Sequence, residues 1–255
     1  MLWYKAWLET RWRFVIGLAL LMCSAAGVVF AYPKVLTLLP LVATDHTGGE
    51  LGRRIKEAAD LARVYRGYVW SQAFRQNMAQ TVTLFAVLLG TGGLLSQTSG
   101  GAALFTLSLP VSRHRLLGVR AAAGLAELFV LAMVPALLIP LLSPAVGEHY
   151  AVGAALVHGV CLFIACTVFF SLAFLLSTVF TDIWRPLLIA CAAAVALALY
   201  EQVFRMFSRY SIFAVMSGET YFRGGQVPWL GLLACAAASA AMLYGAAINT
   251  ARHDF

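Results

Sequence analysis

Long apolar runs separated by short polar segments dominate the chain, and each run approaches the length of a membrane-crossing helix. About 20 residues of helix are needed to cross about 30 Å of hydrocarbon. The expected spans cover residues 14–32, 78–95, 119–142, 152–179, 186–204 and 227–248. The pattern therefore predicts an all-α, polytopic transmembrane helical bundle of about six spans, formed as a single domain over residues 1–255.

Proline and small residues add detail to this prediction. Pro135 and Pro140 lie near the end of the third expected span, where they are expected to kink or break the helix. The last span is rich in Ala, Gly and Ser between Gly231 and Ala241. Such residues allow helices to approach closely, so this span is expected to pack tightly inside the bundle.

Residues 2–14 combine aromatic side chains with a polar stripe. Lys5, Glu9 and Arg13 recur every four residues, whereas apolar side chains stand at Trp3, Tyr4, Trp7, Leu8, Trp12 and Phe14. This pattern predicts an N-terminal amphipathic helix lying in the membrane interface, where tryptophan is favoured. An ordinary aromatic belt ahead of the first span explains the same residues equally well.

The longest polar stretch covers residues 33–77, and Pro33 and Pro40 mark its start. Apolar side chains then recur at helical spacing from Leu51 to Val69, with charged side chains on the remaining turns. The spacing predicts an amphipathic helix. Its many charges exclude a membrane crossing, so it should lie on the surface or pack on a neighbour, within a long first outer loop.

Composition supports a membrane protein. Hydrophobic residues make up 62% of the chain and charged residues only 11%. Soluble globular chains carry about a quarter charged residues, and a fold of this size would need them to cover its surface. The net charge of +7 is carried by basic residues that flank the apolar runs, which favours contact with lipid head groups over nucleic acid. The five cysteines fall inside apolar runs without a C-x-x-C pair, so neither a disulfide frame nor a metal site is expected.

Motifs for nucleotide and membrane-enzyme chemistry are missing from the sequence. The three lysines, Lys5, Lys34 and Lys56, do not lie in a G-x-x-x-x-G-K-[ST] phosphate-binding loop. We therefore expect no nucleotide site, no cofactor and no enzymatic activity of the chain itself. The chain also lacks H-E-x-x-H and G-x-S-x-G motifs. An intramembrane enzyme without a recognisable motif and an ion-coupled carrier remain alternatives to a transport subunit driven by a partner.

Three ionisable side chains lie in or near the expected spans: Glu127, His158 and Glu201. Intramembrane charge is costly, and Glu127 is the best candidate for lining a transport pathway. A neutral carboxyl hydrogen-bonded to a neighbouring helix is an equally good reading. His158 has no second histidine in any span, which argues against haem or metal binding. Glu201 is expected to pair with Arg205, one turn further on.

The segment between the second and third spans is the most specific motif. The string Leu107-Ser108-Leu109-Pro110-Val111-Ser112-Arg113, followed by Leu116-Leu117, resembles the LPVSR…LL segment of type-2 ABC exporter permeases. The Trp- and Arg-bearing N-terminus, the six spans and the ending Ala251–Phe255 are also similar to that family.

The resemblance implies the membrane-spanning subunit of an ATP-driven exporter. Such a subunit works as a homo- or heterodimer with separate P-loop ATPase subunits, which hold the ATP and Mg. It implies a bacterial inner (cytoplasmic) membrane location with both termini cytoplasmic; counting flanking basic residues does not settle the orientation by itself. It also implies that the segment after the second span contacts the ATPase. The candidate coupling residues are Thr106, Pro110, Arg113, His114 and Arg115.

Overall fold

In the computed structural model, residues 2–43, 50–91, 113–180, 182–203 and 211–252 are described, and their regular secondary structure is entirely helical, which confirms the predicted all-α class. The helices are α1 (Leu2–Ala43), α2 (Glu50–Arg63), α3 (Tyr65–Val69), the π-helix η1 (Trp70–Met78), α4 (Ala79–Gly90), α7 (Arg113–Leu142), the 3₁₀ helix η2 (Ser143–Val146), α8 (Val152–Ser177), α9 (Trp184–Val203), α10 (Ile212–Ser217), α11 (Glu219–Phe222) and α12 (Trp229–Arg252).

Among the described residues, five helices are long and apolar enough to cross a membrane: α1, α7, α8, α9 and α12. They correspond to five of the six predicted spans. The predicted second span, 78–95, corresponds to α4, whose 12 residues are too few to cross alone. However, α3, η1 and α4 follow one another without a break, because the residues at both junctions, Trp70 and Ala79, have right-handed helical backbone angles.

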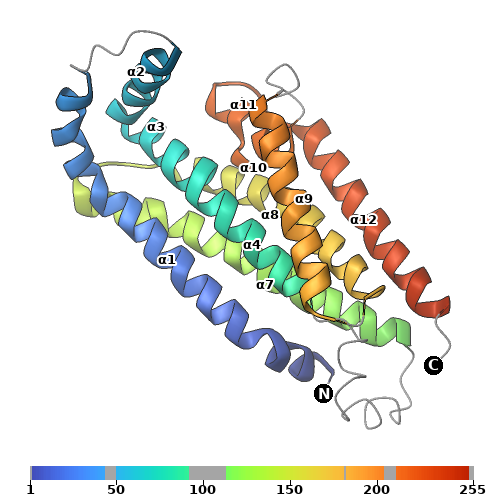
Figure 1. The fold of residues 1–255 in the computed structure, drawn as a ribbon. Helices are drawn as coiled ribbons and strands as arrows, with labels where there is room; N and C mark the ends of the chain where they lie inside the picture. The colour runs from blue at the N-terminus through green and yellow to red at the C-terminus, as the bar shows by residue number, and fades with distance from the viewer. Residues whose placement is uncertain (1, 44–49, 92–112, 181, 204–210, 253–255) are drawn as a thin grey trace.

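The long helices lie side by side, and the short ones gather at one end (Figure 1). The start of α1 and the end of α12 lie at the same end of the bundle, which we call the termini end. The short helices α2, α3, α10 and α11 lie at the opposite end, which we call the far end.

Helix α8 is the centre of the bundle and packs against α4, α7, α9, α10 and α12. Of its most apolar stretch, 56% is buried, against 17% for α9 and 22% for α12. The outer helices accordingly expose large apolar side chains, including Trp12, Leu188 and Leu230. Exposing so much apolar surface to water is unfavourable, whereas contact with lipid tails is not.

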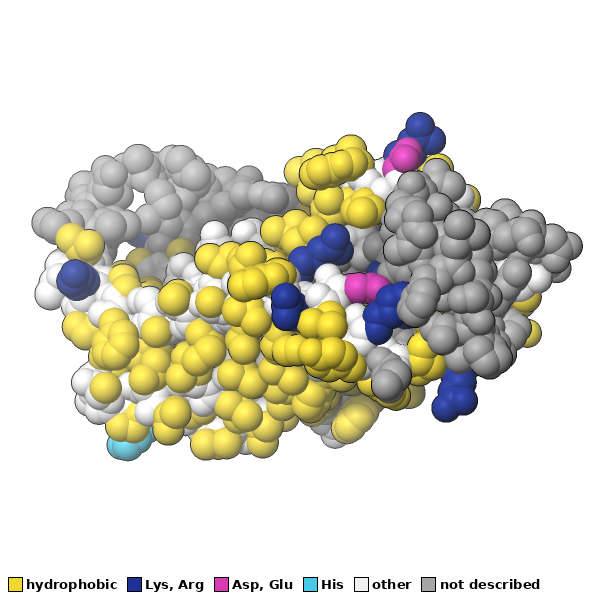
Figure 2. Space-filling model, turned by 90° about the horizontal axis from the view of Figure 1, so that it is seen from below, with side chains coloured by type: hydrophobic (Ala, Val, Ile, Leu, Met, Phe, Trp, Pro, Cys, Tyr) yellow, Lys and Arg dark blue, Asp and Glu magenta, His cyan; other side chains and the backbone are white. Residues whose placement is uncertain are grey.

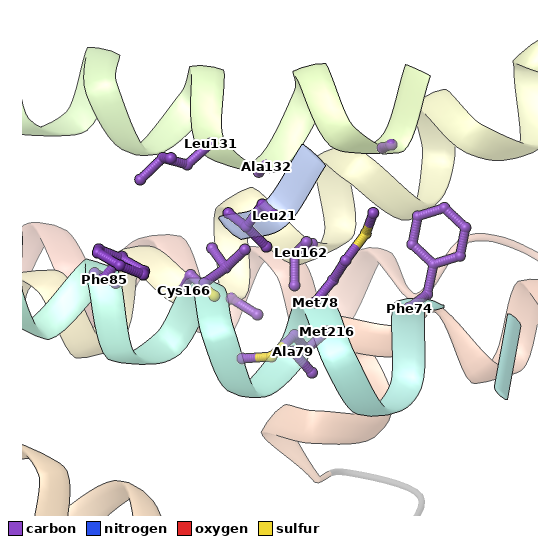
Figure 3. Packing of buried hydrophobic residues seen from close by; sticks show 14 of the residues in the cluster. Leu21, Phe74, Met78, Ala79, Phe85, Leu131, Ala132, Leu162, Cys166 and Met216 are labelled. Carbon is purple, nitrogen blue, oxygen red and sulfur yellow. The ribbon is translucent and has the colours of Figure 1, made fainter. Parts of the chain in front are cut away.

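Side chains from α1, η1, α4, α7, α8 and α10 meet in the core (Figure 3). The buried residues drawn there include Leu21, Phe74, Met78, Phe85, Leu131, Leu162, Cys166 and Met216. Two glycines let the backbones approach: a Cβ at Gly90 would lie 2.5 Å from the carbonyl oxygen of Phe170, and one at Gly124 would lie 2.6 Å from the Phe170 ring. Helices α4, α7 and α8 therefore meet around Phe170 at a separation that larger residues would not allow.

The small residues of α12 pack on one side only. Cys235 and Ala246 are buried, and the Ser239 hydroxyl lies 2.8 Å from that of Thr167 on α8. The alanines between them at 236–238 are exposed. The expectation of tight packing therefore holds for one stripe of the helix and not for its whole circumference.

The predicted N-terminal amphipathic helix at residues 2–14 is not a separate element. These residues form the first turns of α1. Helix α1 runs unbroken for 42 residues, past the predicted boundary at Phe14 and past Pro33. Two side chains of the polar stripe have partners inside the bundle: Glu9 pairs with Arg120 of α7, and Arg13 donates to the carbonyl of Leu88 in α4.

The predicted amphipathic helix exists as α2 but is shorter than expected. It ends at Arg63, and Val64 has extended backbone angles (φ −99°, ψ 124°), so Tyr65 and Val69 belong to the next helix. The hydroxyl of Tyr32 donates to the carbonyl of Arg63 at 3.2 Å, which provides a partner for a carbonyl at the helix end.

The prolines of α7 and the segment before α12 complete the description of the fold. Helix α7 continues through Pro135 and Pro140 to Leu142, so neither proline breaks it. Packing explains this continuity: Ala136 and Ile139, beside the prolines, are fully buried. The described residues 211–226, between the last two long helices, contain α10 and α11, and α10 packs on α8.

Candidate functional site

The predicted coupling residues that the structure describes lie at the start of α7. Thr106 and Pro110 lie outside the described residues. Arg113 and His114 begin α7, and Arg115 is exposed on its first turn. Helix α4 ends and α7 begins at the termini end (Figure 1). Figure 2, which views the molecule from below, shows Lys and Arg side chains beside Asp or Glu among apolar side chains.

Glu127 lies where α7 meets α1. Its side chain is buried, with 6% of the residue exposed. The hydroxyl of Thr10 donates to Oε1 at 2.6 Å, whereas Oε2 has no partner within the described part of the chain. The structure thus places Glu127 in a contact between two helices and leaves one oxygen available to a further donor. Its role in a pathway stays a prediction.

Two more polar contacts involve the same stretch of α1. Glu9 pairs with Arg120 of α7 at 3.6 Å, and both side chains are largely shielded, with 29% and 13% exposed. The guanidinium of Arg13 donates to the carbonyl oxygens of Leu88 at 2.8 Å and Thr91 at 3.1 Å. We call Glu9, Thr10 and Arg13 together the α1 clamp.

The α1 clamp contacts both helices that flank the predicted coupling segment. Arg13 holds the end of α4, whereas Glu9 and Thr10 hold α7. The hollow beside the clamp, between Lys5 and Val119, has room for about one water molecule. The sequence showed the polar stripe at four-residue spacing, but it gave no sign that the partners of Arg13 are backbone carbonyls.

A second polar site lies at the far end, around the carbonyl of Ser217. Both Nδ1 of His158 and Nε1 of Trp70 lie 2.9 Å from this oxygen. Because a carbonyl only accepts, both nitrogens must carry the hydrogen. The His158 ring is fully buried, with its centroid 4.7 Å from that of Phe74. We call Trp70, His158 and Ser217 the far-end site.

Aromatic and basic side chains extend the far-end site. Trp70 stacks on Phe222 with centroids 4.2 Å apart and rings 3° from parallel. The guanidinium of Arg66 lies 5.6 Å from the centroid of the Phe222 ring, and that of Arg75 lies 5.5 Å from the centroid of the Trp70 ring. Such cation–π contacts stabilise a stack, so α3 and η1 are held to α11.

Tyrosines complete this end of the bundle. The ring of Tyr32 lies 4.8 Å from that of Tyr65, and the Tyr65 hydroxyl lies 2.7 Å from that of Ser143. Tyr150 is buried, its hydroxyl has no partner among the described residues, and burial raises its pKa. The sequence analysis did not identify this aromatic cluster. The density of Tyr, Trp and Phe between residues 65 and 74 could have indicated it.

Two further predictions concern the partner of Glu201 and the binding of a metal ion. Oε1 of Glu201 accepts from the backbone N–H of Phe213 at 3.3 Å, whereas Arg205, its expected partner, lies outside the described residues. In the part of the chain that is described, no group of three or more His, Cys, Asp or Glu side chains could hold a metal ion.

The long apolar helices, the exposed apolar outer faces and the polar contacts at both ends define a multi-pass helical membrane protein. Comparison with known proteins adds no family: no protein-family model, curated protein or solved structure matches this chain.

Proposed function

We propose that this chain is the membrane-spanning permease subunit of an ATP-driven exporter, working as a dimer with a separate P-loop ATPase subunit. The observation that carries the proposal is the LPVSR…LL segment at 107–117, together with the position of the helices that flank it. Helix α4 ends and α7, which contains residues 113–117, begins at the termini end (Figure 1). A soluble partner acting there would push directly on two helices of the bundle.

The proposal includes six crossings. We assign the additional crossing to the continuous helix formed by α3, η1 and α4, which lies within the bundle and packs against α1, α7 and α8. An even number of crossings places both termini on one side of the membrane. The common position of the start of α1 and the end of α12 supports this assignment.

We place the termini end in the cytoplasm of a bacterial inner membrane. Cysteine labelling with an impermeant reagent tests this orientation in a chain that lacks the five native cysteines. Thr37→Cys, at an exposed far-end position of α1, should be labelled from outside intact cells, whereas Arg115→Cys should not. Labelling of the second variant and not the first would reverse the topology.

Capture of the partner tests the function itself. The chain purified alone should hydrolyse no ATP, and a tagged chain purified gently from its own cells should bring down an ATPase whose activity needs a P-loop lysine. Replacing Arg113 and Arg115 together with Glu should weaken this complex or uncouple hydrolysis from transport, because it adds like-charge repulsion at the contact. The matched control replaces Arg53 and Arg54 of α2, at the far end. A complex that is lost with the control and kept with the test variant would refute the coupling assignment.

A carrier driven by an ion gradient is the second candidate. The buried carboxyl of Glu127, with its unpartnered Oε2, favours it, because intramembrane carboxyls serve as proton sites in such carriers. An uncoupler that collapses the proton gradient at constant ATP separates the two candidates. It would stop a carrier and leave an ATP-driven exporter working.

A further inference from the structure

One turn of α1 contacts both the end of α4 and the first part of α7. Its contact with α4 is made by Arg13, which bonds to backbone carbonyls. We propose that Arg13 is a positioning residue that fixes the end of α4 to α1, so that the start of α1 moves with the termini-end parts of α4 and α7 when the ATPase acts. This inference rests on the proposed function and assigns a transmitting role to a residue outside the coupling segment.

Arg13 satisfies groups that a helix end leaves unpaired. The last four carbonyls of a helix have no intrahelical partner, and unpaired carbonyls are costly away from water. One guanidinium nitrogen, Nη1, donates to the carbonyls of both Leu88 and Thr91. The hydroxyl of Thr91 donates to the same Leu88 carbonyl at 2.9 Å, and its N–H donates to Val87 at 3.0 Å. The end of α4 is therefore closed by one side chain from another helix.

The bonds of Arg13 act on the backbone of α4. A contact with side chains could slide or change rotamer, whereas a charge-assisted bond to two carbonyls moves with the helix itself. Thr91 is 1% exposed, which shows how closely this end of α4 is covered. A displacement of the end of α4 must therefore either move Arg13 and α1 or break both bonds.

The same turn of α1 is held to α7. Glu9 pairs with Arg120, and Thr10 bonds to Glu127. Residues 9 and 13 are one turn apart on a helix, so these contacts lie on one side of α1 within about 6 Å of axial rise. Helices α4 and α7 also contact each other directly. The α1 clamp joins α1 to this pair of helices, and Arg13 makes the contact with α4.

Arg11 provides a matched control on the same helix. It carries the same charge two residues away, is exposed, and lies 5.5 Å from the ring of its neighbour Trp12. A general effect of positive charge at the start of α1 should appear in both Arg11→Ala and Arg13→Ala. An effect transmitted through the end of α4 should appear only in the second.

The first measurement reports the local contact and needs no ATPase. In a chain that lacks the native cysteines, Thr91→Cys is modified with a maleimide in lipid nanodiscs. We expect slow modification with Arg13 present or with Arg11→Ala, and about tenfold faster modification with Arg13→Ala, in line with the loss of hydrogen bonds to a charged group. Arg13→Lys, which keeps the charge and the donors, should restore at least part of the protection.

The second measurement reports the transmission. In the assembled complex, spin labels at the exposed positions 4 on α1 and 244 on α12 give a distance with and without ATP and vanadate. A second pair at 115 and 244 reports the start of α7. We expect ATP to change both distances in the parent chain and in Arg11→Ala. In Arg13→Ala the 115–244 change should remain and the 4–244 change should be lost.

The outcomes separate the inference from the proposed function. If the 4–244 change persists in Arg13→Ala, or if Arg11→Ala abolishes it equally, the positioning role is refuted while the exporter proposal stands. If ATP changes neither distance in the parent chain, the exporter proposal fails and the inference with it. If Arg13→Ala does not assemble, Arg13→Gln takes its place, because it keeps amide donors and removes the charge, and the same two criteria decide.

Discussion

Gly218 connects α10 to α11 beneath the His158 ring, and replacing it with alanine should destabilise the far end of the bundle. Its φ of +62° lies in the left-handed region, where an L-residue costs about 1–2 kcal/mol. A Cβ at this position would also lie 2.7 Å from Nδ1 of His158. That atom is the one that donates to the Ser217 carbonyl, so the ring must move away from its bond.

The two costs can be added from the structure. His158 is fully buried and stacked on Phe74, so a shift of the ring loses much of a hydrogen bond worth about 0.5–1.5 kcal/mol net. With the backbone cost included, Gly218→Ala should lower the free energy of unfolding by about 1.5–3.5 kcal/mol. Gly224→Ala is the matched control, because Gly224 has φ +86° and no atom within 4 Å of its Cβ position. It should cost only the backbone part, about 1–2 kcal/mol.

Equilibrium unfolding in mixed micelles, followed by far-UV circular dichroism, measures both free energies under one set of conditions. The double variant with His158→Ala tests the cause, because removing the ring should make Gly218→Ala no worse than Gly224→Ala. Equal destabilisation by the two glycine changes in the parent chain would refute the contact with His158 as the source of the extra cost.

Further variants test the other contacts. Trp70→Phe should keep the stack on Phe222 but lose the bond to Ser217, lowering unfolding free energy by about 1 kcal/mol in the same assay; an unchanged value would contradict the bond. Thr10→Val should cost about 1–3 kcal/mol, since it leaves the Glu127 carboxyl buried without its partner, and a neutral result would point to another partner. If Glu127 lines a pathway, Glu127→Gln should change transport measured in vesicles while insertion and assembly persist, because Gln keeps the shape but carries no ionisable proton; unchanged transport would favour a purely structural role.

The spans were predictable from the sequence because hydrocarbon imposes a length and a composition that five of the helices obey. The ends of the helices were harder to predict than their existence, because contacts with distant residues help to decide where a helix ends. Pro33 was expected to end the first span, but a helix of 42 residues continues through it, since proline in a membrane helix is tolerated where neighbouring groups satisfy the backbone. At the end of α2, the carbonyl of Arg63 accepts from Tyr32, which lies 31 positions earlier in the sequence, so no local pattern could reveal this partner.

The candidate sites were predictable to different degrees. Glu127 was identified because a carboxyl in an apolar run is rare, but its partner Thr10 lies 117 positions away and is an ordinary residue in the sequence. The far-end site was missed because its central acceptor, the Ser217 carbonyl, belongs to the backbone, which every residue has. His158 was weighed only as a metal ligand, whereas the fold uses it as a hydrogen-bond donor beside a left-handed glycine.

The π-helical stretch Trp70–Met78 has a consequence for sequence change in this protein. A π-helix uses i→i+5 bonds, so it holds more residues per turn than the α-helices on either side of it. Removing one residue from an α-helix rotates everything beyond it by about 100° and takes the buried face out of register. Within Trp70–Met78 the excess residue can be given up, and the backbone can return to α-helical bonds while Val82, Phe85 and Ala86 keep facing the core. This stretch is therefore where we expect the helix to accept a deletion of one residue, and a deletion scan from Tyr68 to Leu89 should show a single tolerant window there.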